Sequence, residues 1–449
     1  MAPVMVAIAQ MQRLPATNPF GHLSSFRNDR LAFLDSLRGT DVRSVRLGWI
    51  DATLISSPEL AQEVLVERAA DYRKSRGLAL FAKPLIGDGI LASHGEIHRR
   101  RRSIVAPAFQ PKRLAGYADA IAEETQSALG RFEVGSTVDI STRSLELTLA
   151  IVARTLFGTN VEGDIATIDE AMTDALRAMI KLVSSPLPLP PTLPTRHGRV
   201  MVKSARKLRK IVERIVTERR ASGPTGGNDV LSLLLSAKDE VTGEQLTDRE
   251  IYDEAITLFL AGHETTANAL AWAWHLVARN PAVETRLRAE ARAVLGDRLP
   301  TMSDLPSLPY ALCVLKESMR LYPPAYFIGR RALVDTTVAG FEVAKGRTVF
   351  INVWGLHRDA RLFPDPEAFR PERFLDGAEK TWIKGSYMPF GGGPRICVGN
   401  HFALMEGQMI LAQTAARFGL SVPAGTPMPM AEPLITLRLA TPCDMIVGR

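Results

Sequence analysis

The sequence predicts a mainly α-helical protein with a smaller β region. Helical periodicity dominates residues 112–280, whereas short strand-like runs occur near 44–56 and 326–352. The 449 residues include 46% hydrophobic ones, enough for a core that fully encloses a small ligand. Pro15 and Pro19 indicate an extended N-terminal arm over residues 1–20. Because we find neither a repeat nor a clean linker, we expect a single domain over residues 21–449.

Local signals predict the first elements of the chain. SVRLGW and ATLIS, at 44–49 and 52–56, are typical of two short strands. Ser57 and Pro58 follow directly. A serine cap and a proline in the first turn are typical of a helix start, so we expect a helix to begin there.

Proline and glycine divide the helical part of the chain. Prolines break the helical pattern at 184–198, and a glycine-rich stretch breaks it at 222–229. The capping box Thr247–Glu250 opens a long helix that ends before Pro281, about 33 residues and roughly 50 Å long. The remaining expected elements are a helix from about Tyr310 to Tyr322, strands within 326–352, an irregular stretch at 360–376, a Gly-rich loop at 390–399 and a helix after it.

Composition excludes several classes of protein. The net charge is +7, but acidic residues are interleaved with the 55 Lys and Arg, and no nucleic-acid-binding motif occurs. We therefore expect no nucleic acid, and instead a local basic patch for an acidic protein partner. The three cysteines fit neither a disulfide framework nor a zinc site. With no signal peptide or transmembrane anchor in view, we expect a soluble cytoplasmic protein.

The segment PFGGGPRICVGNHFALMEGQ, at 389–408, carries the strongest chemical signal. Cys397 follows three consecutive glycines and Pro394, and it stands immediately before a helix-forming run. Glycines let the backbone approach a flat ligand closely. A helix N-terminus stabilises a thiolate, which could be a nucleophile or a metal ligand. A buried structural cysteine remains the alternative at this point.

The spacing Phe390-x-x-Gly393-x-Arg395-x-Cys397-x-Gly399 resembles the haem-binding loop of the cytochromes P450. The resemblance implies the cytochrome P450 fold, with a long central helix over haem b and this loop beneath it. It also implies that Cys397 is the axial thiolate ligand of the haem iron, and that Phe390, Arg395 and Gly399 belong to the cofactor site.

Three further elements occur in the order typical of that family. Ala261-Gly262-His-Glu264-Thr265-Thr, in the long helix, is similar to the family's oxygen-binding motif. The similarity implies that Ala261 and Gly262 lie at the cofactor, and that Glu264 and Thr265 deliver protons to bound dioxygen. An interior glycine destabilises a helix by about 1 kcal/mol relative to alanine, so the presence of Gly262 in this helix requires an explanation. Close approach of the cofactor is one reason, and helix packing is the alternative.

The second element is a carboxylate–arginine pair. Glu317 and Arg320 stand three residues apart on one helix face and can form an ion pair. With Arg373 from the PERF stretch, they resemble the family's buried network, which implies a structural role in fixing the cysteine loop.

The third element is a set of cations for the haem propionates. His98 and Arg102, on one helix, resemble propionate partners, as do Arg330 and Arg395. Arg331 is an alternative to Arg330. Two carboxylates carried into a protein interior require such partners. We expect Arg99–Arg101 to form a solvated basic face where an acidic redox partner docks.

The resemblance implies a haem-thiolate monooxygenase that inserts one atom of dioxygen into a lipophilic substrate by hydroxylation or epoxidation. The sequence has no GxGxxG motif and no cluster-binding cysteines. Electrons from NAD(P)H would therefore arrive through a separate ferredoxin or flavodoxin and its reductase, and we expect a monomer. A non-catalytic haem-thiolate sensor and a peroxide-driven peroxygenase are the alternatives. Neither would need Glu264 and Thr265.

Segments that resemble the family's substrate-contacting regions are largely apolar, with few polar candidates. Lys83, Lys181 and Tyr326 are among those polar candidates. The segments are 78–90, 179–191, 325–329 and 433–437.

Overall fold

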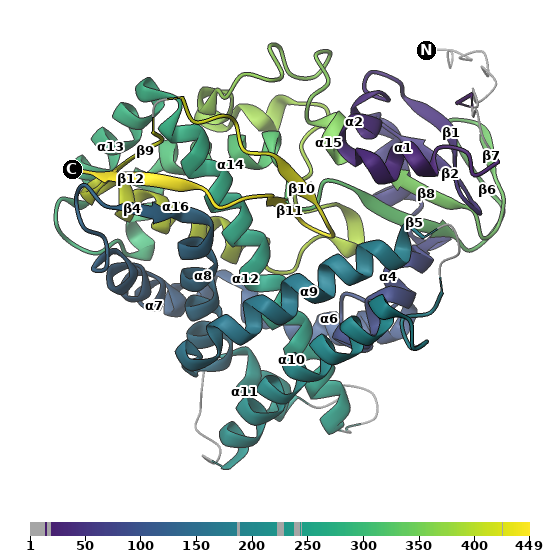
Figure 1. Ribbon diagram of the computed structural model, residues 1–449, viewed down its shortest axis with the longest axis horizontal. Helices are drawn as coiled ribbons and strands as arrows, with labels where there is room; N and C mark the ends of the chain where they lie inside the picture. The colour runs from purple at the N-terminus through teal and green to yellow at the C-terminus, as the bar shows by residue number, and fades with distance from the viewer. Residues whose placement is uncertain are drawn as a thin grey trace.

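The computed structural model describes residues 14–15, 19–185, 189–221, 229–237, 243, 245–423 and 425–449. Helices form most of the molecule, and a strand-rich region lies at one side of it (Figure 1). The predicted fold class is therefore confirmed. The helices are α1 (Leu23–Asn28), α2 (Arg30–Asp35), α3 (Pro58–Gln62), α4 (Arg76–Phe81), α5 (Lys83–Ile86), α6 (Gly95–Val105), α7 (Pro111–Leu129), α8 (Ile140–Phe157), α9 (Ile165–Val183), α10 (Arg196–Ala221), α11 (Val230–Ser236), α12 (Asp248–Ala278), α13 (Pro281–Leu295), α14 (Pro309–Leu321), α15 (Val353–Leu356) and α16 (Asn400–Arg417).

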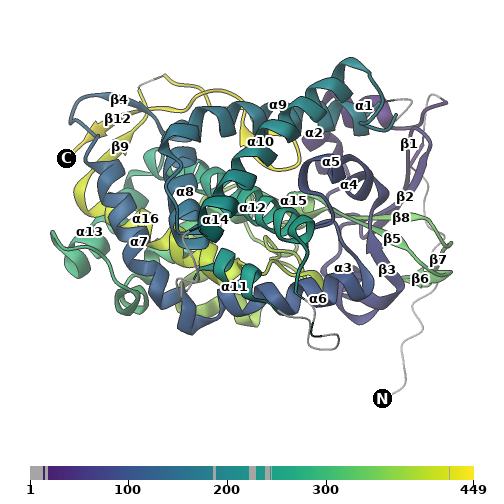
Figure 2. The same ribbon diagram turned by 90° about the horizontal axis from the view of Figure 1, so that it is seen from below.

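Helix α12 runs through the middle of the molecule in both ribbon views (Figures 1 and 2). The expected capping box is present at its start. The Thr247 hydroxyl accepts from the Glu250 backbone N–H at 3.3 Å, and the Glu250 carboxylate accepts from the Thr247 backbone N–H at 2.8 Å. Most of its 31 residues are buried, because α8, α10, α14 and α16 pack around it. A helix enclosed in this way can carry side chains into the centre of the protein.

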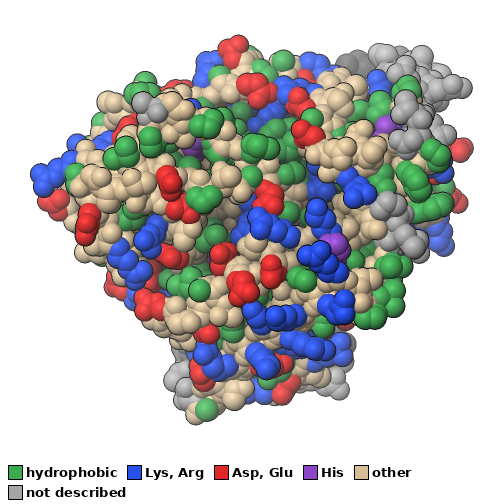
Figure 3. Space-filling model, in the orientation of Figure 1, with side chains coloured by type: hydrophobic (Ala, Val, Ile, Leu, Met, Phe, Trp, Pro, Cys, Tyr) green, Lys and Arg blue, Asp and Glu red, His purple; other side chains and the backbone are tan. Residues whose placement is uncertain are grey.

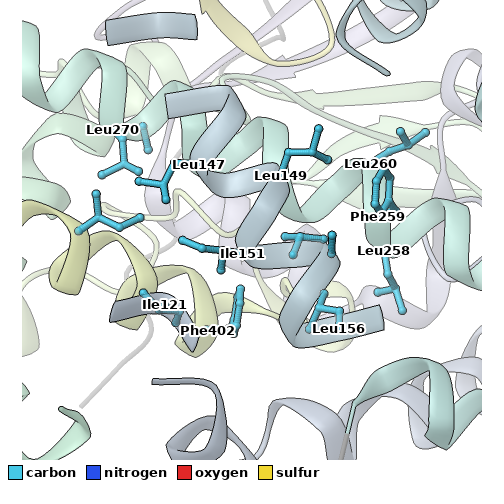
Figure 4. Packing of buried hydrophobic residues seen from close by; sticks show 14 of the residues in the cluster. Ile121, Leu147, Leu149, Ile151, Leu156, Leu258, Phe259, Leu260, Leu270 and Phe402 are labelled. Atoms are coloured by element: carbon cyan, nitrogen blue, oxygen red, sulfur yellow. The ribbon is translucent and has the colours of Figure 1, made fainter. Parts of the chain in front are cut away.

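The main core lies where four helices meet. Ile121 of α7, Ile151 of α8, Leu270 of α12 and Phe402 of α16 belong to one buried cluster (Figure 4). Each is at most 4% exposed. Burial of a side chain of this kind contributes about 1.5–3 kcal/mol, so the packing of these helices holds α12 in place.

The described strands form a mixed five-stranded sheet and three smaller sheets, and the sheet of β4, β12 and β9 lies at the opposite side of the molecule from the five-stranded one (Figure 1). The five strands lie in the order β1-β2-β8-β5-β3, with β2 and β8 parallel and the other neighbours antiparallel. The strands are β1 (Val42–Leu47), β2 (Ile50–Ile55), β3 (Tyr72–Lys74), β4 (Thr137–Asp139), β5 (Ile328–Ala332), β6 (Thr336–Val338), β7 (Phe341–Val343), β8 (Thr348–Ile351), β9 (Gly419–Ser421), β10 (Ala431–Pro433), β11 (Leu437–Leu439) and β12 (Asp444–Gly448).

Several local predictions are confirmed. Strands β1 and β2 pair where the first two strands were expected, and the Ser57 hydroxyl caps α3 by accepting from the Leu60 backbone N–H at 3.4 Å. Most of the expected N-terminal arm lies outside the described residues, as does 222–228 within the second predicted break. No helix in the described part of the chain is long and apolar enough to cross a membrane.

A buried ionic network connects α14 to the segment before the cysteine loop. The Glu317 carboxylate accepts from Arg320 at 2.7 and 2.8 Å, and both side chains are 0% exposed. Arg373 donates to the same carboxylate at 3.3 Å. Such a pair is stabilising only when every polar atom finds a partner, and these three residues match the predicted structural network.

Hydrogen bonds from Arg320 extend this network toward the cysteine loop. Its guanidinium donates to the backbone oxygens of His357 and Pro366, each at 2.7 Å, and of Ala368 at 3.1 Å. The ring Nε2 of His357 in turn accepts from the Met388 backbone N–H at 2.9 Å. Because Met388 stands two residues before Phe390, the buried pair fixes the segment from which the cysteine loop departs.

Glu317→Gln should lower the free energy of unfolding by about 3–5 kcal/mol, because it leaves Arg320 buried without its carboxylate. Urea denaturation followed by circular dichroism measures this change. Glu96→Gln is the matched control, since the Glu96–Arg99 pair is exposed and its loss should leave stability unchanged. Equal effects of the two substitutions would show that the Glu317 network has no special structural role.

Candidate functional site

The cysteine loop is held by backbone hydrogen bonds and shaped by its glycines. The Cys397 backbone N–H donates to the Phe390 oxygen at 3.0 Å, which closes the loop three residues before α16 begins. Gly393 has φ +66°, and a Cβ there would stand 1.8 Å from the Leu65 backbone oxygen. Only glycine fits this position, because the conformation is left-handed and the space is filled.

The Cys397 side chain is exposed, yet nearby protein atoms desolvate it enough to raise the pKa of the thiol. The Gly399 backbone N–H, Arg102 and Lys74 oppose that rise and favour the thiolate. The surroundings therefore suit a thiolate that binds a cation, since burial alone would keep the thiol protonated.

A group of basic residues lies beside this cysteine, and among the described residues none of them has a carboxylate partner. Burial and Arg395 lower the pKa of Arg330 to about 10, and burial and Arg102 lower that of Arg395 to about 10. Burial, Arg395, Lys74 and Arg102 lower the pKa of His98 to about 4. No carboxylate contributes to any of these three shifts. The cluster is therefore electrostatically incomplete and suits a ligand with more than one negative charge.

In the described part of the chain, the three arginines donate to backbone oxygens. Arg102 donates to Ile396 at 2.8 Å, and Arg395 donates to Ser93 at 2.7 Å. Arg330 donates to Gly329 at 3.2 Å. These bonds orient the guanidinium groups and leave their charge uncompensated. Haem carries two propionates, so the cluster fits the cofactor that the sequence resemblance implies.

Lys74 belongs to this cluster, although the sequence analysis missed it. Strand β3 pairs with β5 so that Lys74 stands opposite Arg330. Burial, Arg330 and Arg395 lower the pKa of Lys74 well below its ordinary value. The neighbouring Arg331 instead donates to the Gly346 backbone oxygen at 3.0 Å. Arg330 is therefore the better of the two candidate propionate partners.

Helix α12 contributes Ala261 and Thr265 to the candidate site. Ala261 is exposed and Thr265 is partly exposed, although most of the helix around them is buried. The two residues lie one turn apart, and the Thr265 hydroxyl donates to the Ala261 backbone oxygen at 2.9 Å. This face of α12 therefore borders an accessible space.

The explanation of Gly262 by cofactor approach needs correction. A Cβ at Gly262 would stand 3.1 Å from Val152 Cγ2 and 3.9 Å from Leu156 Cδ1, both on α8. The glycine is thus explained by the close packing of α12 on α8. The sequence pattern could not distinguish these alternatives, because the face that a helical residue presents depends on its neighbours in the fold.

Glu264 points toward the C-terminal strands of the chain. Its carboxylate accepts from the Thr436 hydroxyl at 2.6 Å and lies 3.3 Å from Arg438 Nε. Arg438 also donates to the Thr173 hydroxyl of α9 at 2.9 Å. Burial raises the pKa of Glu264, while Arg438 and Thr436 oppose the rise. Glu264 is therefore a buried acid whose charge depends on partners that the sequence analysis missed.

Another buried acid lies behind the same stretch of α12. Glu406 of α16 is 0% exposed, and burial raises the pKa of its carboxyl well above the ordinary value. The Thr266 hydroxyl is the neighbour that opposes this rise. Burial therefore favours the protonated form of Glu406.

The expectation of a solvated face at Arg99–Arg101 is wrong for one of its three residues. Arg101 is only 4% exposed and forms ion pairs with Glu250 at 3.3 Å and Glu254 at 3.2 Å. Arg100 pairs with the same Glu250 at 3.3 Å, and only Arg99 is largely exposed. The ion pairs with Glu250 and Glu254 of α12 hold Arg101 inward, so the three arginines do not form one docking face.

The polar candidates in the expected substrate regions have other roles or positions. The Tyr326 hydroxyl is buried and donates to the Leu434 backbone oxygen at 2.7 Å. Lys83 pairs with Asp88 at 2.9 Å, and Lys181 is exposed. None of the three is therefore a strong candidate for binding a substrate carboxylate.

Comparison with known proteins agrees with this site. Residues 15–445 match the family model of cytochrome P450. The chain is 40% identical over 412 residues to cyclooctat-9-en-7-ol 5-monooxygenase of Streptomyces melanosporofaciens, covering 90% of this chain and 88% of the relative. It is 31% identical over 411 residues to pentalenene oxygenase of Streptomyces avermitilis, covering 90% and 89%. The chain belongs to the cytochrome P450 family.

Proposed function

We propose that this cytochrome P450 oxygenates a terpenoid hydrocarbon or alcohol, by hydroxylation or epoxidation. Its family consists of haem-dependent oxidoreductases that use dioxygen and NAD(P)H-derived electrons. Two relatives are named for oxygenating cyclooctat-9-en-7-ol and pentalenene. The apolar segments expected at the substrate, in which Tyr326 and Lys83 are already engaged, support a lipophilic compound without a carboxylate.

The observation that carries the oxygenase part of the proposal is the arrangement of the cofactor residues. Cys397 would supply a thiolate to the haem iron, and Lys74, His98, Arg102, Arg330 and Arg395 would hold the propionates. Phe390 and Gly399 shape the loop around the thiolate. When bound, the haem supplies an iron centre at which dioxygen is activated.

Two side chains of α12 would take part in proton delivery. The Thr265 hydroxyl lies on the accessible face, where it can hold a hydrogen bond to the reacting oxygen. Glu264 has a raised pKa and can exchange a proton at its carboxylate. In the described conformation this carboxylate is held by Arg438 and Thr436, so a rotation away from Arg438 would precede proton transfer.

Redox partners would dock near the cysteine loop. We infer a separate acidic ferredoxin or flavodoxin with its reductase, acting on a monomeric protein in the cytoplasm. Arg99 and Lys112 are exposed cations in this region, and Phe109, three residues before Lys112, packs against Gly399. Arg99 is thus retained from the expected patch, and Lys112 takes the place of Arg100 and Arg101 as a candidate for contact with an acidic carrier.

The proposal is tested by turnover under isotopically labelled dioxygen. A panel of terpenoids is first screened for a spin-state change of the haem, and the binders are then incubated with a ferredoxin, its reductase and NADPH. One labelled oxygen atom in a terpenoid product is expected. Binding of fatty acids or steroids with no response to any terpenoid would overturn the substrate class.

Lys74→Met should accelerate haem loss by about tenfold or more, because a charge-assisted contact to a propionate is removed. Transfer of haem to apomyoglobin measures the rate. Lys345→Met, at an exposed turn, is the control and should leave the rate unchanged. The haem-free Lys74→Met protein should also be no less stable than wild type, since the substitution relieves repulsion among buried cations. An unchanged haem-loss rate would remove Lys74 from the cofactor site.

Thr265→Ala should reduce the product formed per NADPH consumed by about tenfold, with hydrogen peroxide released instead. The ratio is measured from NADPH absorbance, peroxide and product in the same reaction. Thr265→Ser retains the hydroxyl and should recover most of the coupling. Full coupling in the alanine variant would exclude Thr265 from proton delivery.

A further inference from the structure

The first half of helix α10 is unusually basic. Residues 196–212 hold seven Lys or Arg and no Asp or Glu. In the second half of the helix, each of three arginines has an acidic partner. Arg219 pairs with Asp229 and Arg220 with Asp248, each at 2.7 Å, and Arg214 pairs with Asp164. The second half of the helix is therefore compensated, whereas the first half is only partly so, because within it Arg209 pairs with Glu213 and Lys207 with Glu170, each at 3.1 Å.

The uncompensated charge forms a stripe along one helix face. Arg199, Lys203, Arg206 and Lys210 follow each other at intervals of four, three and four residues, and all are exposed. Among the described residues none of these four has an ion-pair partner, whereas the adjacent Lys207 pairs with Glu170 at 3.1 Å. Like charges at this spacing repel one another, so the stripe weakens the isolated helix and suits an anion.

The stripe borders a surface hollow of about 430 Å³. In the space-filling view, Lys and Arg side chains gather in the lower part of the molecule, where Figure 1 places α10 (Figure 3). The other wall of the hollow comes from Thr192–Pro194, and Val202 lies between the cations. Leu193 is 42% exposed there. The hollow thus combines a cationic wall with an apolar rim.

We propose that this hollow binds an amphiphile with a phosphate head group. The phosphate would lie on the stripe of Arg199, Lys203, Arg206 and Lys210, and the apolar chain would lie along Leu193 and Val202. Arginine and lysine are the usual phosphate partners, and a compact hollow fits one head group better than the repeated phosphates of a nucleic acid. The site is separate from the haem residues, so the proposal does not depend on the proposed function.

The test compares wild type with Lys203→Glu/Arg206→Glu. One arm measures co-sedimentation with phosphatidylcholine vesicles that contain phosphatidylglycerol, against phosphatidylcholine alone. The other measures calorimetric binding of dihexanoylphosphatidic acid below its micelle concentration. Wild type should bind in at least one arm, and the double variant should bind at least about tenfold more weakly. The vesicle arm identifies a bilayer lipid, and the second arm identifies a free amphiphile.

Lys345→Glu/Lys384→Glu is the matched control, because it changes the net charge equally at exposed positions outside α10. It should bind as wild type does, and the haem spectrum of both double variants should remain unchanged. Absence of binding by wild type in both arms would overturn the proposal, as would equal weakening in the two double variants. Tight binding of wild type to duplex DNA without binding in either arm would also overturn it.

Discussion

The fully buried Glu317–Arg320 pair is the interaction on which the site depends. Its charges have no access to water, so each polar atom must be satisfied within the protein. The structure meets this requirement by bringing the backbone at His357, Pro366 and Ala368 to the guanidinium. The same contacts hold the segment that leads into the cysteine loop. The Glu317–Arg320 ion pair in α14 thereby contributes to the position of Cys397.

A second constraint is the opposite electrostatic situation beside the cysteine. The Glu317 network is complete within the protein, whereas no described carboxylate contributes a counter-charge to the cation cluster around Arg330 and Arg395. A folded protein tolerates such a cluster when a bound anion completes it. The two groups have different consequences, since one stabilises the polypeptide and the other prepares it for a cofactor. Lys74 belongs to the second group.

Much of the site could be predicted from the sequence, because its signals are local. The glycines and arginine around Cys397, the capping box at Thr247 and the spacing of Glu317 and Arg320 each lie within a few residues of one another. Such patterns can be recognised in the sequence without knowledge of the fold. The element boundaries near proline and glycine were predicted for the same reason.

What could not be predicted depends on contacts between distant segments. Lys74 meets Arg330 through pairing of β3 with β5, and Arg438 reaches Glu264 from a strand near the C-terminus. Gly262 and Arg101 were misassigned because the faces of α12 and α6 are set by the helices that pack on them. These errors all concern direction of a side chain, which sequence spacing alone does not specify.

The most direct measurement is the absorption spectrum of the reduced protein with carbon monoxide, recorded for wild type and for Cys397→Ala. Thiolate ligation by Cys397 predicts a strongly red-shifted Soret band in wild type and its loss in the variant. Cys313→Ala should retain the band, because Cys313 is buried in α14 outside the cysteine loop. A histidine-type spectrum in folded wild-type protein, or a red-shifted band that persists in Cys397→Ala, would contradict this account of the site.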